Sequence, residues 1–273
     1  NNDWVKALAE YRAAEAGLPN DAQLHYRIGL AHRRLGQVVE ALGRFERSTA
    51  LNPNAVNEVS TQVDTVLALR RFRQVVELCA RYEALATAET RLVSLRLQAQ
   101  YELDGDRAAY LRGMAELPPG RWDPHGLYAA YSTALRTGDL AAAERVLADP
   151  RLSSVPGSNG AINEPVALHR AMVAWLRGRP DDARRFADEA IGEYLRQKWA
   201  PRQAAWARMG LAVAEALAGR TDDALRCARL ALDEQTARDV YSGADMASEY
   251  GRVLLICNRR DEALALLREH IAR

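Results

Sequence analysis

The apolar positions of residues 21–54 form two stretches of helical periodicity separated by a glycine. They recur every three or four residues, at Leu24, Ile28, Ala31 and Leu35 and then at Val38, Ala41, Leu42, Phe45 and Leu51. This spacing indicates one face of a helix rather than a strand. Glycine commonly follows the last residue of a helix because it adopts a left-handed conformation easily, so Gly36 is expected to end the first helix. Asn52-Pro53 is expected to end the second. The pattern therefore predicts a helical hairpin, in which the small residues Gly29 and Ala41 let the two helices approach closely.

Positions equivalent to Ala41 recur along the whole chain. They are separated by 34 residues four times and then by 40, 41 and 39, at Ala7, Ala41, Val75, Ala109, Ala143, Ala183, Ala224 and Ala263. One hairpin of this size cannot bury its own apolar stripe, so each hairpin needs a neighbour stacked against it. The sequence therefore predicts a row of stacked helical hairpins.

The hairpin of residues 21–54 resembles a tetratricopeptide repeat, whose signature includes Leu-Gly, Ala-x3-Phe and a terminal Pro. The matching residues are Ile28-Gly29, Ala41-x3-Phe45 and Pro53, whereas His25 and His32 stand at the Trp and Tyr positions. The resemblance implies an all-α fold, an α-solenoid in which antiparallel helix pairs stack into a right-handed superhelix. It implies one continuous solenoid, in which residues 1–20 are the second helix of an incomplete repeat. Residues 21–157 hold repeats of about 34 residues and residues 158–273 longer ones of about 40.

The later repeats share one local pattern at the hairpin turn. A Gly or Asn ends the first helix and two acids then stand in the first turn of the second, in residues 178–183, 219–224 and 258–263. Acids there face the positive end of the helix dipole, so capping is the better interpretation than acid–base catalysis. Longer second helices are expected, around 191–199. Three interruptions are expected, at 117–124, 149–165 and 239–245; a loop such as 149–165 is either functional or mobile.

The chain is also similar to repeat arrays of bacterial signalling proteins, which accompany Ser/Thr kinases, adenylate cyclases or winged-helix regulators. The residues that carry this similarity are 122–126, 138–143 and 257–264. Because residue 1 stands in the middle of a repeat, we expect a larger parent protein. The expected location is the cytoplasm, or the periplasm if a membrane segment precedes residue 1.

Charge and cysteine usage exclude several function classes. Lys and Arg total 37 against 36 Asp and Glu, whereas a direct nucleic-acid surface is normally basic. No apolar run reaches the roughly 20 residues of a membrane helix. Cys79, Cys227 and Cys257 lack metal-ligand spacing and indicate buried reduced thiols. We therefore expect no cofactor, no metal site, no direct nucleic-acid contact and no membrane segment in this part of the parent protein.

No catalytic motif stands out, so the chain is not expected to be an enzyme. His25 and His32 share a helical face but lack a third ligand, and they are interpreted as packing or surface residues. Trp199 and Trp206 lie among basic residues in a pattern that can stack on nucleic-acid bases. Packing of the two tryptophans at a repeat junction, covered by Arg side chains, is the better interpretation.

In the family that the chain resembles, the first helix of each repeat lines a concave face. Carried over to this sequence, that implies an inner surface with Ser60, Leu30, Leu67, Leu168 and Met172, of which the four apolar residues are expected to pack inward. Tyr, Arg and Trp most often dominate interfaces. The expected binding residues are Tyr26, Arg33, Arg34, Asp64, Tyr128, Arg136 and Trp175. The Lys and Asn residues of the family's carboxylate clamp are absent.

These observations predict a non-catalytic module of a larger bacterial regulatory protein that binds a protein or peptide segment through its concave face. One alternative is a sensor whose solenoid changes curvature when it binds a peptide or a small ligand. Another is a homo-oligomerisation scaffold, because terminal repeats without a polar cap expose apolar surface.

Overall fold

A computed structural model describes residues 3–82, 90–117, 127–157 and 161–271. The chain divides into two compact units, residues 1–129 and residues 130–273. In both units antiparallel helices follow one another and pack pairwise, so the expected all-α solenoid architecture is confirmed.

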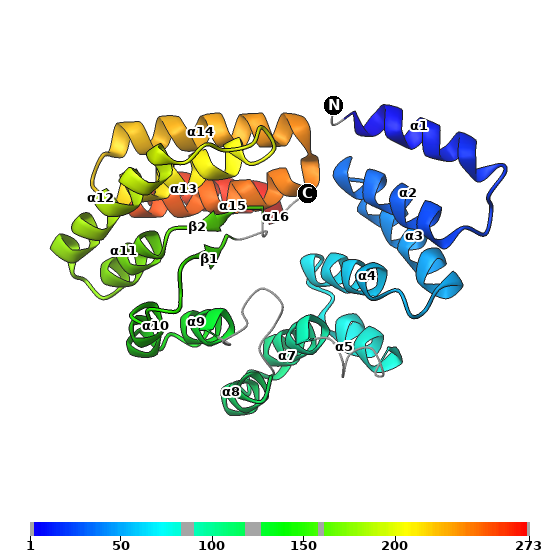
Figure 1. Ribbon diagram of the computed structural model, residues 1–273, viewed down its shortest axis with the longest axis horizontal. Coiled ribbons are helices and arrows are strands. Elements are labelled where there is room, and N and C mark those ends of the chain that lie inside the picture. Colours follow the sequence, from blue (N-terminus) through cyan, green and yellow to red (C-terminus); the bar gives the residue numbers. More distant parts are fainter. Residues whose placement is uncertain (1–2, 83–89, 118–126, 158–160, 272–273) are drawn as a thin grey trace. The chain divides into compact units, whose positions relative to one another are not determined.

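Among the described residues of the first unit, a single helix precedes three helix pairs, whose order along the chain can be followed in Figure 1. The single helix is α1 (Trp4–Glu15), and the pairs are α2 (Ala22–Arg34) with α3 (Val38–Leu51), α4 (Val56–Ala68) with α5 (Phe72–Arg81), and α7 (Thr90–Asp104) with α8 (Arg107–Ala115). Each helix packs against the next, and α4 also packs against α7, the first helix of the following pair. Helix α9 (Leu127–Arg136) begins in this unit and ends in the second.

The second unit continues the pairing with longer helices. Its elements are α10 (Leu140–Leu147), strands β1 (Val155–Pro156) and β2 (Asn163–Glu164), α11 (Val166–Leu176), α12 (Pro180–Arg196), α13 (Ala204–Leu217), α14 (Thr221–Arg238), α15 (Val240–Ile256) and α16 (Arg260–Ile271). The two strands pair antiparallel, with Val155 opposite Glu164. Helix α12 has 17 residues and α14 has 18, against 14 in α3, whereas α16 has 12. The expected lengthening of the second helices therefore holds for α12 and α14.

Each hairpin turn places one residue in the left-handed region of φ. Glycine holds this position at five turns, at Gly36, Gly105, Gly138, Gly178 and Gly219. The other two described turns use Asn258, with φ of 58°, and Arg70, with φ of 56°. The acids after three of these turns stand in the first turn of α12, α14 and α16, as expected. The left-handed residue therefore marks where each first helix ends and its partner begins.

The cores lie between the paired helices. The small residues that mark the repeats are fully or almost fully buried at Ala41, Val75, Ala143, Ala183, Ala224 and Ala263. Ala7 and Ala109 are half-buried, and Tyr110 is buried beside Ala109. In the second unit one continuous cluster runs from Ile162 to Ala263. Stacking of each hairpin on the next thus removes the apolar stripe from water, which is the main stabilising contribution in such folds.

One of the three expected interruptions differs from expectation. The break at 239–245 is wrong, because Asp239 alone separates α14 from α15. Its carboxylate accepts hydrogen bonds from the Ser242 backbone N–H at 3.1 Å and from the Ser242 hydroxyl at 2.9 Å, which begins α15 at once. The described residues of 149–165 form no helix, as expected, and they include the short strands β1 and β2. Residues 118–124 of the first interruption lie outside the described residues.

Candidate functional site

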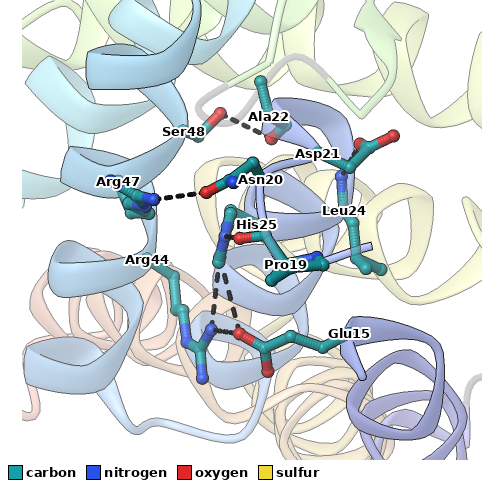
Figure 2. Close-up of polar contacts among 10 residues, drawn as sticks. All are labelled: Glu15, Pro19, Asn20, Asp21, Ala22, Leu24, His25, Arg44, Arg47 and Ser48. Carbon is teal, nitrogen blue, oxygen red and sulfur yellow. Dashed lines mark hydrogen bonds and ion pairs between the residues drawn. The ribbon is translucent and has the colours of Figure 1, made fainter. Parts of the chain in front are cut away.

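Helix α2 is anchored on one side by a polar seam between α1, the following turn and α3 (Figure 2). The Nε2 of His25 lies 3.0 Å from the carbonyl oxygen of Pro19. A carbonyl only accepts, so Nε2 carries the proton and Nδ1 is left as an acceptor. Arg44 donates to that Nδ1 at 3.2 Å and also pairs with the Glu15 carboxylate. One arginine from α3 therefore joins the end of α1 to the beginning of α2.

Further contacts secure the beginning of α2. The Asp21 carboxylate accepts from the Leu24 backbone N–H at 2.7 Å and caps the helix. From α3, the Ser48 hydroxyl donates to the Ala22 carbonyl at 2.8 Å, and Arg47 donates to Asn20 at 2.6 Å (Figure 2). The seam fixes one side of α2 against α1 and α3. The side chains on the opposite side of α2 therefore have a defined orientation.

Phe45 of α3 supports the two functional side chains of α2. Its ring is fully buried and lies against Gly29, where no side chain intervenes. The Tyr26 ring centroid lies 5.9 Å from that of Phe45, and the Arg33 guanidinium carbon lies 5.9 Å from the same ring centroid. Tyr26 and Arg33 therefore share one aromatic support.

Two threonines of α4 receive hydrogen bonds from these α2 side chains. The Thr61 hydroxyl donates to the Asn57 carbonyl at 2.7 Å, so it accepts at 3.2 Å from the Tyr26 hydroxyl. In the same way Thr65 donates to the Thr61 carbonyl at 2.7 Å and accepts from Arg33 at 3.1 Å. Each threonine hydroxyl donates its hydrogen to a carbonyl of its own helix, so its oxygen is held in place as an acceptor. The two threonines thereby connect the first helices α2 and α4.

Asp64 lies on the same side of α4 and forms an ion pair with Arg91 of α7. Burial raises the pKa of the Asp64 carboxyl, while the charges of Arg91 and Arg33 act in the opposite direction. Arg91 itself is exposed. We give the name first-helix face to a group of side chains of α2, α4 and α7, of which Thr65 is buried: Tyr26, Arg33, Thr61, Asp64, Thr65 and Arg91.

The first-helix face combines an aromatic ring, hydroxyl groups and two arginines around one carboxylate. Its formal charge is therefore positive by one, and Arg34 adds another positive charge on α2. Such a surface can hydrogen-bond a peptide backbone and pair with acidic side chains. It contains no nucleophile activated by a neighbouring base, so the arrangement favours binding over covalent chemistry.

The structure brings together three of the expected binding residues, namely Tyr26, Arg33 and Asp64. Arg34 is the last residue of α2 and is half-buried. Tyr128 and Arg136 lie on α9, where Tyr128 is half-buried and Arg136 exposed. Trp175 lies in the last turn of α11, in the second unit, with 38% of its surface exposed.

Sequence reasoning did not select Thr65 or Arg91 as parts of this face, nor Phe45 as the ring that supports it. Ser60 was expected on the inner surface, but it is buried, and its neighbour Thr61 faces α2 instead. The signal for the threonines was the spacing of four residues between positions 61 and 65, which places both on one side of a helix. Leu67 and Leu168 pack into the cores as expected.

His25, His32, Trp199 and Trp206 have packing roles. His25 and His32 are buried, and His32 Nδ1 lies 2.6 Å from the Gln37 side-chain oxygen. Trp206 is buried in the core of the second unit, and Trp199 donates its Nε1–H to the Tyr194 carbonyl at 3.3 Å. The packing interpretation of both tryptophans is confirmed.

Metal and membrane features are absent from the part of the chain that the structure describes. No three His, Cys, Asp or Glu side chains there are grouped to hold a metal ion. In the same residues, no helix is both long and apolar enough to span a membrane.

Two segments match the model of the tetratricopeptide repeat family, residues 165–189 and 205–229. They begin at α11 and α13 and continue into α12 and α14. No curated protein is similar to the chain in sequence.

Several solved structures are similar in fold. Yeast Tom70 is 14% identical with a TM-score of 0.55, over 98% of this chain and 54% of that one, so the chain spans about half the length of Tom70. A tetratricopeptide repeat protein from Parabacteroides merdae is 14% identical with a TM-score of 0.48, over 92% of each chain. A thermophilic one from Thermus thermophilus is 25% identical with a TM-score of 0.40, over 86% of this chain and 99% of that one. The chain is thus similar in fold to Tom70, and its residues 165–189 and 205–229 are similar in sequence to the tetratricopeptide repeat family.

Proposed function

We propose that this chain is a non-catalytic interaction module that holds a peptide segment of a partner protein on the first-helix face. The observation that carries the proposal is the alignment of Tyr26, Arg33, Asp64 and Arg91 across three successive first helices. Such an arrangement offers donors, acceptors and charge along one line, which suits an extended peptide with acidic side chains.

The side chains of this face are held in place before any partner arrives. Tyr26 and Arg33 are each fixed twice, by the Phe45 ring and by a threonine of α4. Preorganised side chains lose less conformational entropy on binding, so more of the contact free energy remains as affinity. We therefore expect Arg33 and Tyr26 to contribute more to binding than the exposed arginines of the same helices.

The wider setting is also part of the proposal. The similarity of residues 138–143 and 257–264 to repeat arrays of bacterial signalling proteins supports a role as the partner-binding part of a larger regulatory protein. In that setting the module would position a regulatory partner beside an effector domain elsewhere in the parent protein.

A peptide library displayed on phage tests the proposal directly. Peptides selected on the wild-type chain are synthesised, and their affinities are measured by fluorescence anisotropy for Arg33→Gln, Tyr26→Phe and Arg91→Gln. We expect Arg33→Gln to weaken binding about tenfold or more, and selected peptides to be enriched in Asp and Glu.

The matched control is Arg27→Gln, since Arg27 is an exposed arginine on the same helix outside this face. This variant should retain the wild-type affinity, and circular dichroism should show equal helicity in all variants. Peptides that bind equally well to the wild type and to all three face variants would place the binding surface elsewhere.

A further inference from the structure

Asp64 is the acidic side chain of the first-helix face, and the charges of both arginines of that face act on it. Its carboxylate forms an ion pair with Arg91 of α7, and Arg33 of α2 also attracts it. Within the described residues, no charged group of α3 or α5, which also pack against α4, acts on this carboxyl. Asp64 therefore neutralises part of the positive charge that an acidic partner would use.

An acid of a bound partner would have to share Arg91 with Asp64. A guanidinium has five N–H donors, so Arg91 can hold a second carboxylate beside the first. These donors are accessible, because 60% of the Arg91 side chain is exposed, against 24% of the Asp64 side chain. Two carboxylates within about 4–6 Å of each other disfavour the state in which both are ionised. Uptake of one proton removes the repulsion between them.

Of the two acids, Asp64 is the one that takes up the proton. Burial already raises the pKa of its carboxyl above the ordinary 3.8, and the two arginines offset this effect only in part. An acid of the partner that reaches Arg91 from the solvent side keeps more of its hydration, so burial disfavours its charged form less. The negative charge of the partner then raises the pKa of Asp64 further. The complex therefore holds a proton on Asp64 more readily than the free protein does.

We propose that binding of an acidic peptide to the first-helix face is coupled to the uptake of a proton by Asp64. This inference rests on the proposed function, because it concerns the regulation of the same face. Proton uptake on binding means that affinity rises as pH falls through the pKa of Asp64 in the complex, and that it levels off below the pKa of Asp64 in the free protein. Near neutral pH, the ionised Asp64 weakens the binding of acidic partners.

The test uses a probe whose own charge does not change with pH. This probe is a tetrapeptide of cysteic acid, acetylated and amidated at its ends, whose sulfonates stay ionised at every pH used. Its affinity for the intact chain is measured by isothermal titration calorimetry at about pH 7.5 and about pH 5.5. The wild type should bind at least about threefold more tightly at the lower pH. Titrations in two buffers with different ionisation enthalpies should show net proton uptake on binding.

Two variants assign the coupling to Asp64. Asp64→Asn places a neutral amide of nearly the same shape where the protonated carboxyl would be. At the higher pH it should bind the probe at least about threefold more tightly than the wild type, and its affinity should change much less with pH. Glu77→Gln, which removes one negative charge from an exposed position of α5, is the matched control and should behave as the wild type does. Circular dichroism should show equal helicity in all three proteins.

The outcomes separate this coupling from the proposed function. Equal binding by the wild type at both pH values would overturn the coupling and leave the proposed function intact. The same conclusion would follow if Asp64→Asn bound no more tightly than the wild type at the higher pH, or if Glu77→Gln showed an equal gain. No saturable binding of the probe by the wild type at either pH would contradict the proposed function, and the coupling with it.

Discussion

The ring of Phe45 lies so close to the backbone of Gly29 that a Cβ atom on residue 29 would come within 2.5 Å of its Cε1 atom. Phe45 is fully buried, and its ring supports both Tyr26 and Arg33. In the second unit a comparable contact joins successive pairs, because a Cβ on Gly210 of α13 would come within 2.1 Å of the hydroxyl oxygen of Tyr194 of α12. The absence of a side chain in the first helix is therefore what allows an aromatic ring of the second helix to complete the core.

Gly29→Ala should destabilise the protein. The added methyl group forces the Phe45 ring or the α2 backbone to move, and such overpacking costs about 1–3 kcal/mol. Chemical denaturation followed by circular dichroism measures the loss. The control is Gly43→Ala, where a Cβ meets nothing within 4 Å and the residue lies inside α3. That variant should gain about 0.5–1 kcal/mol from helix propensity. An unchanged free energy of unfolding in Gly29→Ala would mean that the core around Phe45 is loosely packed.

Arg70→Gly should stabilise the first unit. Arg70 adopts φ of 56°, a conformation that costs a residue with a side chain about 1–2 kcal/mol. Its guanidinium carbon lies 5.5 Å from the Phe72 ring centroid, a contact worth about 0.5–1 kcal/mol at an exposed site. The strain is the larger effect, so thermal unfolding should shift upward by a few degrees. Gly36→Ala places a side chain in the equivalent turn, where φ is 78°, and should lower the melting temperature. A lower melting temperature for Arg70→Gly would show that the contact with Phe72 outweighs the backbone strain at Arg70.

Glu15 should make the unfolding free energy pH-dependent in acid. The hydrogen bond from Arg44 holds the pKa of the Glu15 carboxyl below its ordinary value of 4.5. The unfolded chain then binds the proton more readily, so this stabilisation is complete above the ordinary pKa and is lost as pH falls through the folded pKa. Glu15→Gln should therefore reduce the slope of unfolding free energy against pH from about pH 5 downward. Glu10→Gln, an exposed position on the same helix, should leave the slope unchanged. If unfolding free energy has the same slope against pH in both variants, the hydrogen bond from Arg44 does not lower the pKa of Glu15 enough to affect stability.

Cys79 should be an unreactive thiol in the folded protein. Burial raises its pKa to about 11, against the usual 9.0, so its thiolate fraction near neutral pH falls about 100-fold. A variant with Cys227→Ser and Cys257→Ser leaves Cys79 as the single thiol. Its alkylation by iodoacetamide should be at least about 100-fold slower in the folded than in the unfolded protein. Similar rates in both states would indicate that the region around Cys79 opens readily.

Sequence periodicity was reliable for the helices and less so for the connections between them. The apolar spacing and Gly36 predicted the α2–α3 hairpin, and the small marker residues predicted the later pairs. The break expected at 239–245 was wrong, although this segment contains a glycine, Gly243, in a position where a turn would be compatible with the sequence. In the structure that glycine lies inside α15, where a Cβ would come within 2.9 Å of the Thr236 hydroxyl oxygen. The sequence alone does not distinguish a glycine required for close helix packing from a glycine required for a turn.

The sequence by itself determined that the chain forms stacked helical hairpins, since only stacking removes a stripe of apolar residues that recurs at every repeat. The resemblance to tetratricopeptide repeats also implied that Tyr26, Arg33 and Asp64 lie on the inner side of first helices. Only the tertiary structure decided that Thr61, rather than Ser60, meets Tyr26, and that Arg91 pairs with Asp64. The physical reason is that the rotation of one helix against the next depends on how side chains of different repeats interlock. Spacing within a single helix does not contain that information.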